Sequence, residues 1–273
     1  MAPPSITLGP LRLVLILVAA VVGGVVNSIA GGGTLLTFPA LVGLGIPAMI
    51  ANATSTVALW PGAVASMWGY SDLLVGMRGW VTRFAIPSLA GGLVGAVLLI
   101  KTPASRFDAI VPWLVLSATL LFIAQRPVAN WIARGDASRS PDNEVDDHTA
   151  DRLVEPSTKL LIYQFGVAVY GGYFGAGIGI LMLAALGFMG FRNIHRMNGL
   201  KNWGGLCANA VAAATFAFSG LVSWPIAGAM AIGAAAGGYG GSRLAQRVSQ
   251  ARVRQAIIVI GLASSLWLVT RVG

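Results

Sequence analysis

Long apolar segments separated by short polar connections are the feature that most limits how this chain can fold. Of its 273 residues, 56% are hydrophobic and only 10% are charged. A helix needs about 20 apolar residues to cross a hydrocarbon core of about 30 Å, and backbone groups in lipid must be satisfied within helices or closed barrels. The sequence therefore predicts an all-α polytopic membrane protein with about ten membrane segments, at 11–29, 34–46, 52–70, 80–100, 107–124, 160–174, 177–191, 198–218, 225–242 and 253–269.

Two of these segments are too short to span the bilayer as straight helices. At ~1.5 Å per residue, segment 34–46 makes about 20 Å of helix, which is less than the ~30 Å core. Segment 177–191 is similarly short. We expect both to be half-helices, tilted helices or re-entrant pieces.

The second half of the chain repeats the first. The stretch AGGGTLLTFPALVGLG at 30–45 aligns with GAGIGILMLAALGFMG at 175–190 at a spacing of 145 residues, and one inserted residue then pairs Asn52 with Asn198 at 146. The same spacing of 146 pairs Gly91 with Gly237, Gly92 with Gly238, Gly95 with Gly241 and Arg106 with Arg252. A nearly constant offset over this distance indicates duplication.

Each repeat holds five segments, so the second repeat should be inverted relative to the first. If all ten segments change sides, fourteen Lys and Arg residues lie in the odd-numbered loops and four lie on the other side. Because cytoplasmic loops carry the excess of Lys and Arg, we predict cytoplasmic odd loops and periplasmic termini in a bacterial inner membrane. A single crossing for each short segment with its predecessor would give nine to nine. Re-entrant hairpins stay open, because they leave the parity unchanged.

A polar stretch at 126–158 joins the first membrane repeat, 1–125, to the second, 159–273. It holds seven acidic residues and four arginines, and we predict a flexible cytoplasmic linker. The formal charge of +9 does not indicate a nucleic-acid partner, because the basic residues are scattered between apolar segments. The expected partners are the lipid bilayer and a small anionic substrate, and the sequence leaves a homodimer open.

The membrane segments lack the groups that enzymes and cation carriers use. Every acidic residue lies at a segment end or in the linker, whereas cation pumps and many proton-coupled carriers need a carboxylate within the membrane. His148 lies in the linker, His195 stands alone near a cytoplasmic edge, and Cys207 is the only cysteine. The sequence thus predicts no catalytic site, no metal site and no cofactor.

Each repeat contains a glycine-rich break that we interpret as half of a binding site. Irregular backbone at membrane depth is tolerated where it lines a cavity or is buried in protein, and the helix that begins after it offers N–H groups and partial positive charge to an anion. The predicted substrate-binding residues in the two breaks are Asn27, Ser28, Gly31, Gly32, Gly33, Thr34, Tyr173, Gly175 and Gly177. The alternative is that the glycines only permit close helix packing.

The segment after each break adds polar residues on one helical face. These predicted binding residues are Asn52, Thr54 and Ser55 in the first repeat and Asn198, Lys201 and Asn202 in the second. A lysine inside an apolar segment must reach the interface or meet an anion, so Lys201 is the predicted counter-charge, with snorkelling to the cytoplasmic interface as the alternative. We interpret Asn209 as a helix-packing residue and the tryptophans near segment ends as an interfacial belt.

Three stretches of the chain resemble one family. AGGGTLLTFPALVGLGIPAMIANATSTVAL at 30–59, RMNGLKN at 196–202 and GGYGGSRLAQRVSQARVR at 237–254 are similar to the sulfite exporter TauE/SafE family of bacterial membrane transporters. The resemblance implies a secondary carrier of sulfite or organosulfonate-type anions, commonly directed outward. This chain reads Asn52-Ala53-Thr54-Ser55 where the family pattern is expected to have a small residue or glycine before Thr-Ser, so the resemblance does not specify the substrate within the class.

We therefore predict a non-enzymatic, alternating-access exporter that binds a small sulfur-containing anion between the two breaks. A passive anion channel is the alternative, because it could use the same helix ends without alternating access.

Overall fold

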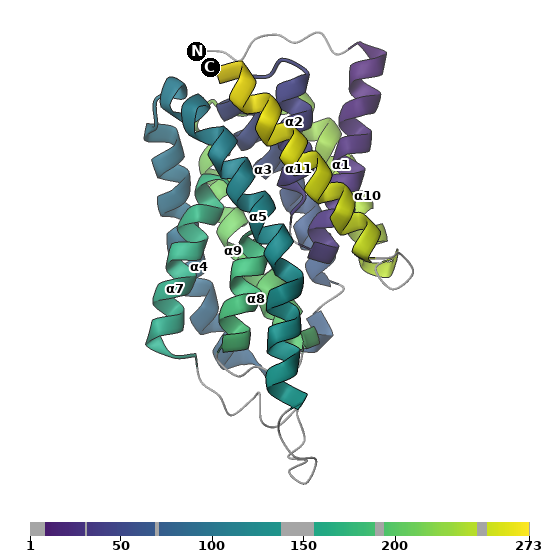
Figure 1. Ribbon diagram of the computed structural model, residues 1–273. Helices are drawn as coiled ribbons and strands as arrows, with labels where there is room; N and C mark the ends of the chain where they lie inside the picture. The colour runs from purple at the N-terminus through teal and green to yellow at the C-terminus, as the bar shows by residue number, and fades with distance from the viewer. Residues whose placement is uncertain are drawn as a thin grey trace.

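The computed structural model is a bundle of α-helices (Figure 1). The structure describes residues 9–30, 32–68, 71–137, 156–188, 194–244 and 250–272. Within these ranges it has ten α-helices, one 3-10 turn and no strand. The elements are α1 (Pro10–Ala30), α2 (Thr34–Gly43), α3 (Ala48–Trp68), η1 (Ser71–Leu74), α4 (Arg78–Lys101), α5 (Ala104–Ala137), α7 (Thr158–Tyr173), α8 (Ile178–Phe188), α9 (Ile194–Ala217), α10 (Trp224–Leu244) and α11 (Gln250–Val272).

The prediction of an all-α protein is confirmed, and each predicted apolar segment coincides with a helix. The largest difference is at α5, which continues to Ala137 although its predicted apolar segment ends at 124. The first part of the predicted linker, 126–137, is therefore helical. Apolar composition marks where a helix leaves the hydrocarbon, whereas the helix itself can continue into water because its hydrogen bonds are internal.

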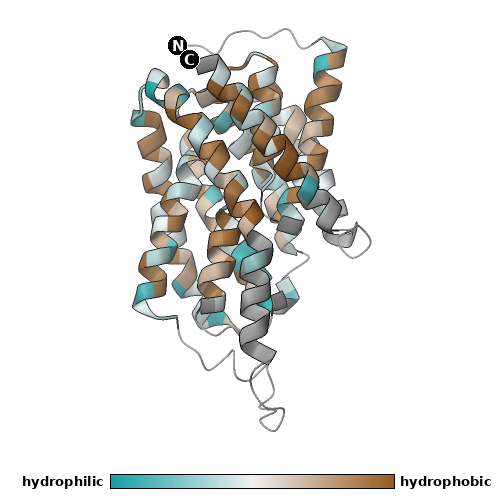
Figure 2. Cartoon of the chain, in the orientation of Figure 1, coloured by the Kyte–Doolittle hydropathy of each residue, from teal (hydrophilic) through white to brown (hydrophobic). Residues whose placement is uncertain are grey.

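The outer faces of the bundle are suited to lipid. Ile86 of α4, Ile232 of α10 and Leu266 of α11 are each more than two-thirds exposed, and Figure 2 shows hydrophobic residues along much of the length of the helices. A soluble protein rarely exposes such a surface. Three described helices are long and apolar enough to cross a membrane, over Pro10–Ser28, Arg78–Lys101 and Ala104–Ala124, and shorter apolar helices cover Thr34–Gly43, Ile178–Gly187 and Gln255–Thr270.

The two halves of the chain interleave rather than forming separate bundles. α1 packs along α10 as α7 packs along α4, α3 contacts α10 as α9 contacts α4, and α2 contacts α11 as α8 contacts α5. α3 meets α9, and α5 meets α11. This pattern is unchanged when the elements α1–α5 are exchanged in order for α7–α11. α1 begins and α11 ends at one end of the bundle, whereas α5 ends and α7 begins at the other (Figure 1).

Glycines allow the backbones of these helices to touch. A Cβ on Gly92 of α4 would lie 2.4 Å from the carbonyl oxygen of Ala208 in α9, and a Cβ on Gly238 of α10 would lie 2.5 Å from that of Gly62 in α3. The spacing of 146 relates Gly92 to Gly238 and Gly62 to Ala208, so the same contact is made twice. In lipid, where apolar side chains gain little from association, such close approach supplies dispersion and Cα–H···O contacts.

Alanine at Gly92 or Gly238 should destabilise the protein by about 1–3 kcal/mol, because the added methyl group meets backbone that cannot move aside. Gly166→Ala is the matched control, since its Cβ would meet nothing within 4 Å. It should be neutral or stabilising by up to ~1 kcal/mol, the helix-propensity difference between the two residues. Thermal unfolding of the purified protein in detergent measures the three values. Similar melting of all three variants would contradict this account of the packing.

Candidate functional site

The chain breaks twice inside the bundle. α1 ends at Ala30 and α2 begins at Thr34, while α7 ends at Tyr173 and α8 begins at Ile178. After each break the chain turns back on the helix that precedes it, so that α2 contacts α1 and α8 contacts α7. α2 and α8 are 10 and 11 residues long, as expected for half-helices. Gly31, a predicted binding residue, lies outside the described residues.

Glycine serves different purposes in the two breaks. Gly175 and Gly177 have φ angles of +83° and +80°, a region that side chains with a Cβ rarely adopt. In the first break the requirement is space. A Cβ on Gly32 would lie 2.1 Å from the ring of Phe122, and one on Gly33 would lie 2.3 Å from a carbonyl oxygen of α1. The second break thus requires glycine for its backbone conformation, and the first requires glycine for close packing.

A small cavity of about 50 Å³, lined by both polar and apolar residues, lies where the two breaks meet. One water molecule needs roughly 10–15 Å³ of such volume, so the cavity can hold a few waters or a small oxyanion. The lining residues are Asn27 of α1; Thr34 of α2; Thr56, Leu59, Trp60, Ala63 and Ser66 of α3; Gly175 between α7 and α8; Ile178 and Gly179 of α8; and Lys201, Asn202, Gly205, Leu206 and Asn209 of α9.

Many of these lining residues are pairs related by the duplication. The spacing of 146 links Thr56 to Asn202, Leu59 to Gly205, Trp60 to Leu206 and Ala63 to Asn209, and the spacing of 145 links Thr34 to Gly179. Equivalent faces of α3 and α9 therefore form opposite walls, and the equivalent first turns of α2 and α8 both reach the cavity. The cavity lies between the two halves of the chain.

Lys201 is the only ionisable side chain among the described residues that line the cavity. It is 3% exposed, and within the described part of the chain no hydrogen bond or ion pair reaches its ammonium group. The two carboxylates whose burial the structure describes, Asp72 and Asp108, are exposed. Because a buried ammonium without a partner is strongly unfavourable, the cavity is complementary to negative charge.

Further donors belong to residues that border the same space. The amide nitrogen Nδ2 of Asn202 is buried without a partner among the described residues. At the first turn of α8 the N–H of Ile180 donates to the carbonyl of Gly177 at 3.1 Å. The preceding N–H groups, of Ile178 and Gly179, have no acceptor in the described structure, as is usual at a helix start. A cation, an amide and a helix N-terminus together suit an oxyanion.

The structure brings five of the predicted site residues together in the cavity lining: Asn27, Thr34, Gly175, Lys201 and Asn202. Lys201 lies in this lining and not on the outer face of the bundle. Asn198 is half-buried in α9 outside the lining, and Gly32, Gly33 and Gly177 flank it without contributing to it.

Asn52 and Tyr173 lie behind the site instead. The Asn52 amide donates from Nδ2 to the carbonyl of Tyr173 at 2.9 Å, so it satisfies the last residue of α7. The other side-chain atom of Asn52, Oδ1, is buried without a partner in the described structure. The Tyr173 hydroxyl donates to Thr102 at 3.3 Å, and its ring contacts Phe107. These two residues hold the second break in place.

The remaining predicted hydroxyls also join elements to one another. The hydroxyl of Thr54 accepts the N–H of Ser223 at 3.0 Å, just before α10. The hydroxyls of Ser55 and Thr37 bond to each other and connect α3 to α2. Ser28 is 1% exposed and accepts a hydrogen bond from a serine of α3. They position the walls without lining the cavity.

Four polar or aromatic residues line the cavity and were not predicted: Thr56, Trp60, Ser66 and Asn209. In the sequence, Trp60 was interpreted as part of the interfacial belt and Asn209 as a helix-packing residue, because these are the more common roles of such residues in membrane helices. The duplication contained the missing signal for Thr56, because the spacing of 146 maps it onto Asn202, which was predicted. For Ser66 we found no comparable signal in the sequence; the structure places it in the lining, where its hydroxyl donates to that of Ser28 at 3.0 Å.

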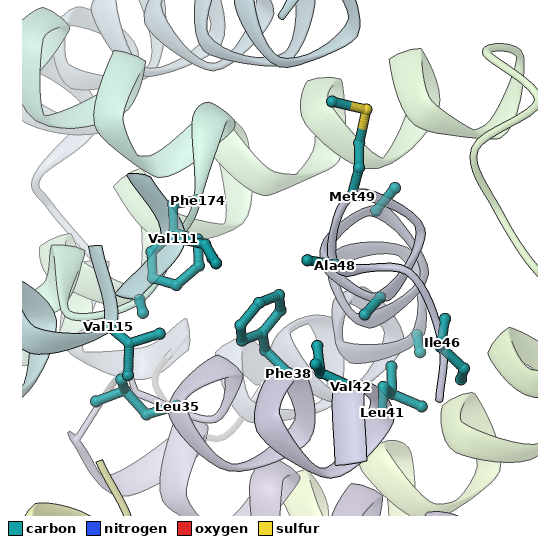
Figure 3. Close-up of a cluster of buried hydrophobic side chains, with 14 of the residues drawn as sticks. Leu35, Phe38, Leu41, Val42, Ile46, Ala48, Met49, Val111, Val115 and Phe174 are labelled. Carbon is teal, nitrogen blue, oxygen red and sulfur yellow. The ribbon is translucent and has the colours of Figure 1, made fainter. Parts of the chain in front are cut away.

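An apolar cluster borders the second break. Phe38 lies one turn beyond Thr34 in α2 and meets Phe174 edge to face, with ring centroids 5.5 Å apart. Figure 3 shows Phe38 pointing toward Phe174 and Val111 of α5. All three are buried, and Phe174 directly precedes Gly175. On this side of the cavity, therefore, an anion would meet packed apolar side chains.

Comparison with known proteins gives one family. The sequence profile of the family described as Sulfite exporter TauE/SafE matches residues 15–268. The chain is 28% identical over 262 residues to the probable membrane transporter protein ORF9 of Sinorhizobium sp, covering 93% of this chain and 91% of that protein. It is 27% identical over 264 residues to the probable membrane transporter protein YfcA of Escherichia coli strain K12, covering 94% and 89%. No solved structure matches.

Cysteine labelling tests the cavity in a Cys207→Ala background, since Cys207 is the only cysteine. Ser66→Cys and Asn209→Cys should react with a small anionic methanethiosulfonate, because both positions line the cavity that contains Lys201. Ser88→Cys is the matched control, because Ser88 is buried elsewhere and should react on the order of tenfold more slowly, only when the packing opens. The rate of each reaction is measured as the loss, over time, of labelling by a maleimide that is added afterwards. Equal rates at the three positions would rule out an accessible cavity.

Proposed function

Because the chain belongs to the sulfite exporter TauE/SafE family, we propose that it is a secondary transporter of a small sulfur-containing anion such as sulfite or an organosulfonate. The observation that carries the substrate class is the buried Lys201, which has no partner among the described residues, in the cavity between the two halves. A bound anion supplies the partner that the ammonium lacks. Asn202 and the first turn of α8 can donate hydrogen bonds to the remaining oxygens.

We further propose that α1–α5 and α7–α11 are inverted repeats in the bacterial inner membrane. The exchangeable packing pattern and the paired glycine contacts support this arrangement. Inverted repeats give a carrier two access states when each repeat adopts the arrangement of the other. The binding site then stays near the middle while the barrier moves from one side to the other.

The charge rule assigns a direction to the state seen here. It puts the α4–α5 junction outside, and Tyr173 and Phe107 pack toward that junction next to Phe174. On this topology the Phe38–Phe174 cluster closes the periplasmic side, and the cavity is approached from the cytoplasm. This is the state in which an exporter loads its substrate.

A passive anion channel is the second candidate, because the same donors could line a pore. The buried apolar cluster beside the second break favours a carrier, since it interrupts any continuous polar path. Counterflow separates the two functions. A carrier is stimulated by unlabelled substrate on the far side and saturates, whereas a channel conducts current with weak saturation.

The direct test is transport by the purified full-length protein in liposomes, with labelled sulfite, thiosulfate, sulfoacetate and taurine offered separately. We expect saturable, counterflow-stimulated uptake of at least one of these compounds, of which taurine alone is a zwitterion without net charge. Conductance without counterflow would establish the channel. Absence of flux with all four, for protein that remains folded in the vesicles, would remove the proposed substrate class.

Replacing Lys201 with glutamine should lower the transport efficiency, kcat/KM, by about tenfold or more, because a buried charge-assisted hydrogen bond contributes roughly 1.5 kcal/mol or more. Lys101→Gln is the matched control, since Lys101 is exposed at the end of α4. Expression and melting temperature should match the wild type for both variants. Unchanged kinetics in Lys201→Gln would leave the lysine with a structural role only.

The proposed topology can be tested in intact cells in the Cys207→Ala background. Ser105→Cys, exposed at the start of α5, should react with a membrane-impermeant maleimide added outside. Val75→Cys, exposed between η1 and α4, should react only after the inner membrane is permeabilised. The opposite result would mean that the orientation is inverted. Labelling of both positions from outside would show that α4 does not cross the membrane, which would contradict the inverted repeats.

A further inference from the structure

Lys201 differs from the other lysines of the chain. Three lysines are present in the sequence; Lys101 and Lys159 are exposed at helix ends, whereas Lys201 is 3% exposed and lines the cavity. Within the described residues it has no partner. A group in this position has two states, charged with an anion beside it or neutral without one.

Charged neighbours do not supply an alternative partner in the described structure. α9 packs against α3, α4, α7, α8 and η1, and neither α3 nor α8 contains an ionisable residue. The charges of α4 are at its two ends, in Arg78, Arg83 and Lys101. In η1, Asp72 is exposed.

The other titratable groups near α9 also lie outside the cavity lining. α7 has an exposed lysine at its start and three tyrosines; one of these, Tyr163, bonds to the carbonyl of Leu181 at 3.4 Å. On α9 itself, His195 and Arg196 lie at the helix start, and Arg196 already has an interaction partner. Cys207 is buried one turn or more beyond Lys201. Lys201 is thus the one described group that can exchange a proton with the cavity.

We propose that Lys201 carries a proton together with the anion, so that the transporter moves one proton with each monovalent anion in the same direction. This inference rests on the proposed function and adds the coupling ion to it. The loaded cavity holds an ammonium and an anion, which together are neutral. The empty carrier must also change its access state, and a lone ammonium in a closed cavity opposes that step. A neutral amine does not.

The cycle balances in protons and charge. On the loading side the neutral Lys201 amine takes a proton from water, and the ammonium binds the anion. On the release side the anion leaves, and the ammonium then returns its proton to water. The carrier goes back with a neutral amine. Proton coupling in membrane carriers often uses a carboxylate. Here every carboxylate lies at the end of a membrane segment or in the linker, so the lysine takes that role.

The test uses methanesulfonate in proteoliposomes, because this monovalent anion does not itself titrate near neutral pH. Any proton that accompanies it then passes through the protein. We expect net uptake to be accelerated when the outside is acidic and the interior to acidify, as reported by trapped pyranine. Exchange of labelled for unlabelled methanesulfonate should be far less sensitive to the pH gradient, because only the loaded carrier moves during exchange.

Lys201→Arg separates coupling from binding. Arginine keeps its proton throughout, so the variant can pair with the anion but cannot return empty. We expect exchange to persist while net uptake and its dependence on the pH gradient are lost. Lys201→Gln should lower both activities by about tenfold or more, as expected for transport above. Lys159→Arg, at an exposed position, should match the wild type. Size-exclusion profiles and melting curves check that each variant is folded.

The outcomes separate the inference from the proposed function. Wild-type exchange with net uptake that ignores the pH gradient, or that requires sodium instead, would overturn proton coupling and leave an anion carrier. Net uptake by a folded Lys201→Arg protein with an intact pH response would also overturn it. If arginine prevents folding, the wild-type pyranine signal still decides. Absence of both exchange and net flux, with methanesulfonate and with the four compounds above, would count against the anion carrier itself.

Discussion

Backbone contact between helices is the interaction on which the rest of this structure depends. In lipid there is little hydrophobic driving force for helices to associate. Here glycine lets the helices approach so closely that the methyl group of an alanine would not fit between them. Gly91 of α4 faces the carbonyl of Phe165 in α7, and Gly237 of α10 faces that of Val21 in α1. These contacts hold the α1–α2 and α7–α8 pairs on opposite sides of one space. Only there can both pairs break without presenting bare backbone groups to lipid.

Each break creates two charged ends, and the structure treats them differently. At the second break, α7 ends with a partial negative charge and α8 begins with a partial positive charge. Asn52 donates its amide hydrogen to the terminal carbonyl of Tyr173, so the negative end is satisfied behind the site. The first N–H groups of α8 remain available at the cavity. An anion that enters therefore meets the positive end of α8 and Lys201. The negative end of α7 is bonded to Asn52 and does not face the anion.

The sequence was sufficient for the helices and for part of the site, for different reasons. Hydropathy locates membrane helices because lipid imposes the same requirement on every segment, but it does not locate the end of α5, which continues beyond the apolar stretch to Ala137. Lys201 was predictable because an intramembrane charge has few alternatives. The sequence did not show that Asn202 lines the cavity and Asn52 does not, since both lie on a polar helical face. What distinguishes them is the position of the Tyr173 carbonyl, which follows only from the packing of α3 against the second break.

The duplication makes the scaffold symmetric but leaves the site asymmetric. At the spacing of 146, Lys201 corresponds to Ser55 and Asn209 to Ala63, so the second repeat supplies the larger polar group at both positions. Ser55 bonds to the hydroxyl of Thr37 and contributes no charge. Two symmetric lysines would place two ammonium groups in about 50 Å³, which would favour multivalent anions and leave an uncompensated charge beside a monovalent one. With the single Lys201, the α9 wall balances one unit of charge. The opposite wall of α3, which includes Trp60, remains able to contact the apolar part of the proposed sulfonate substrate.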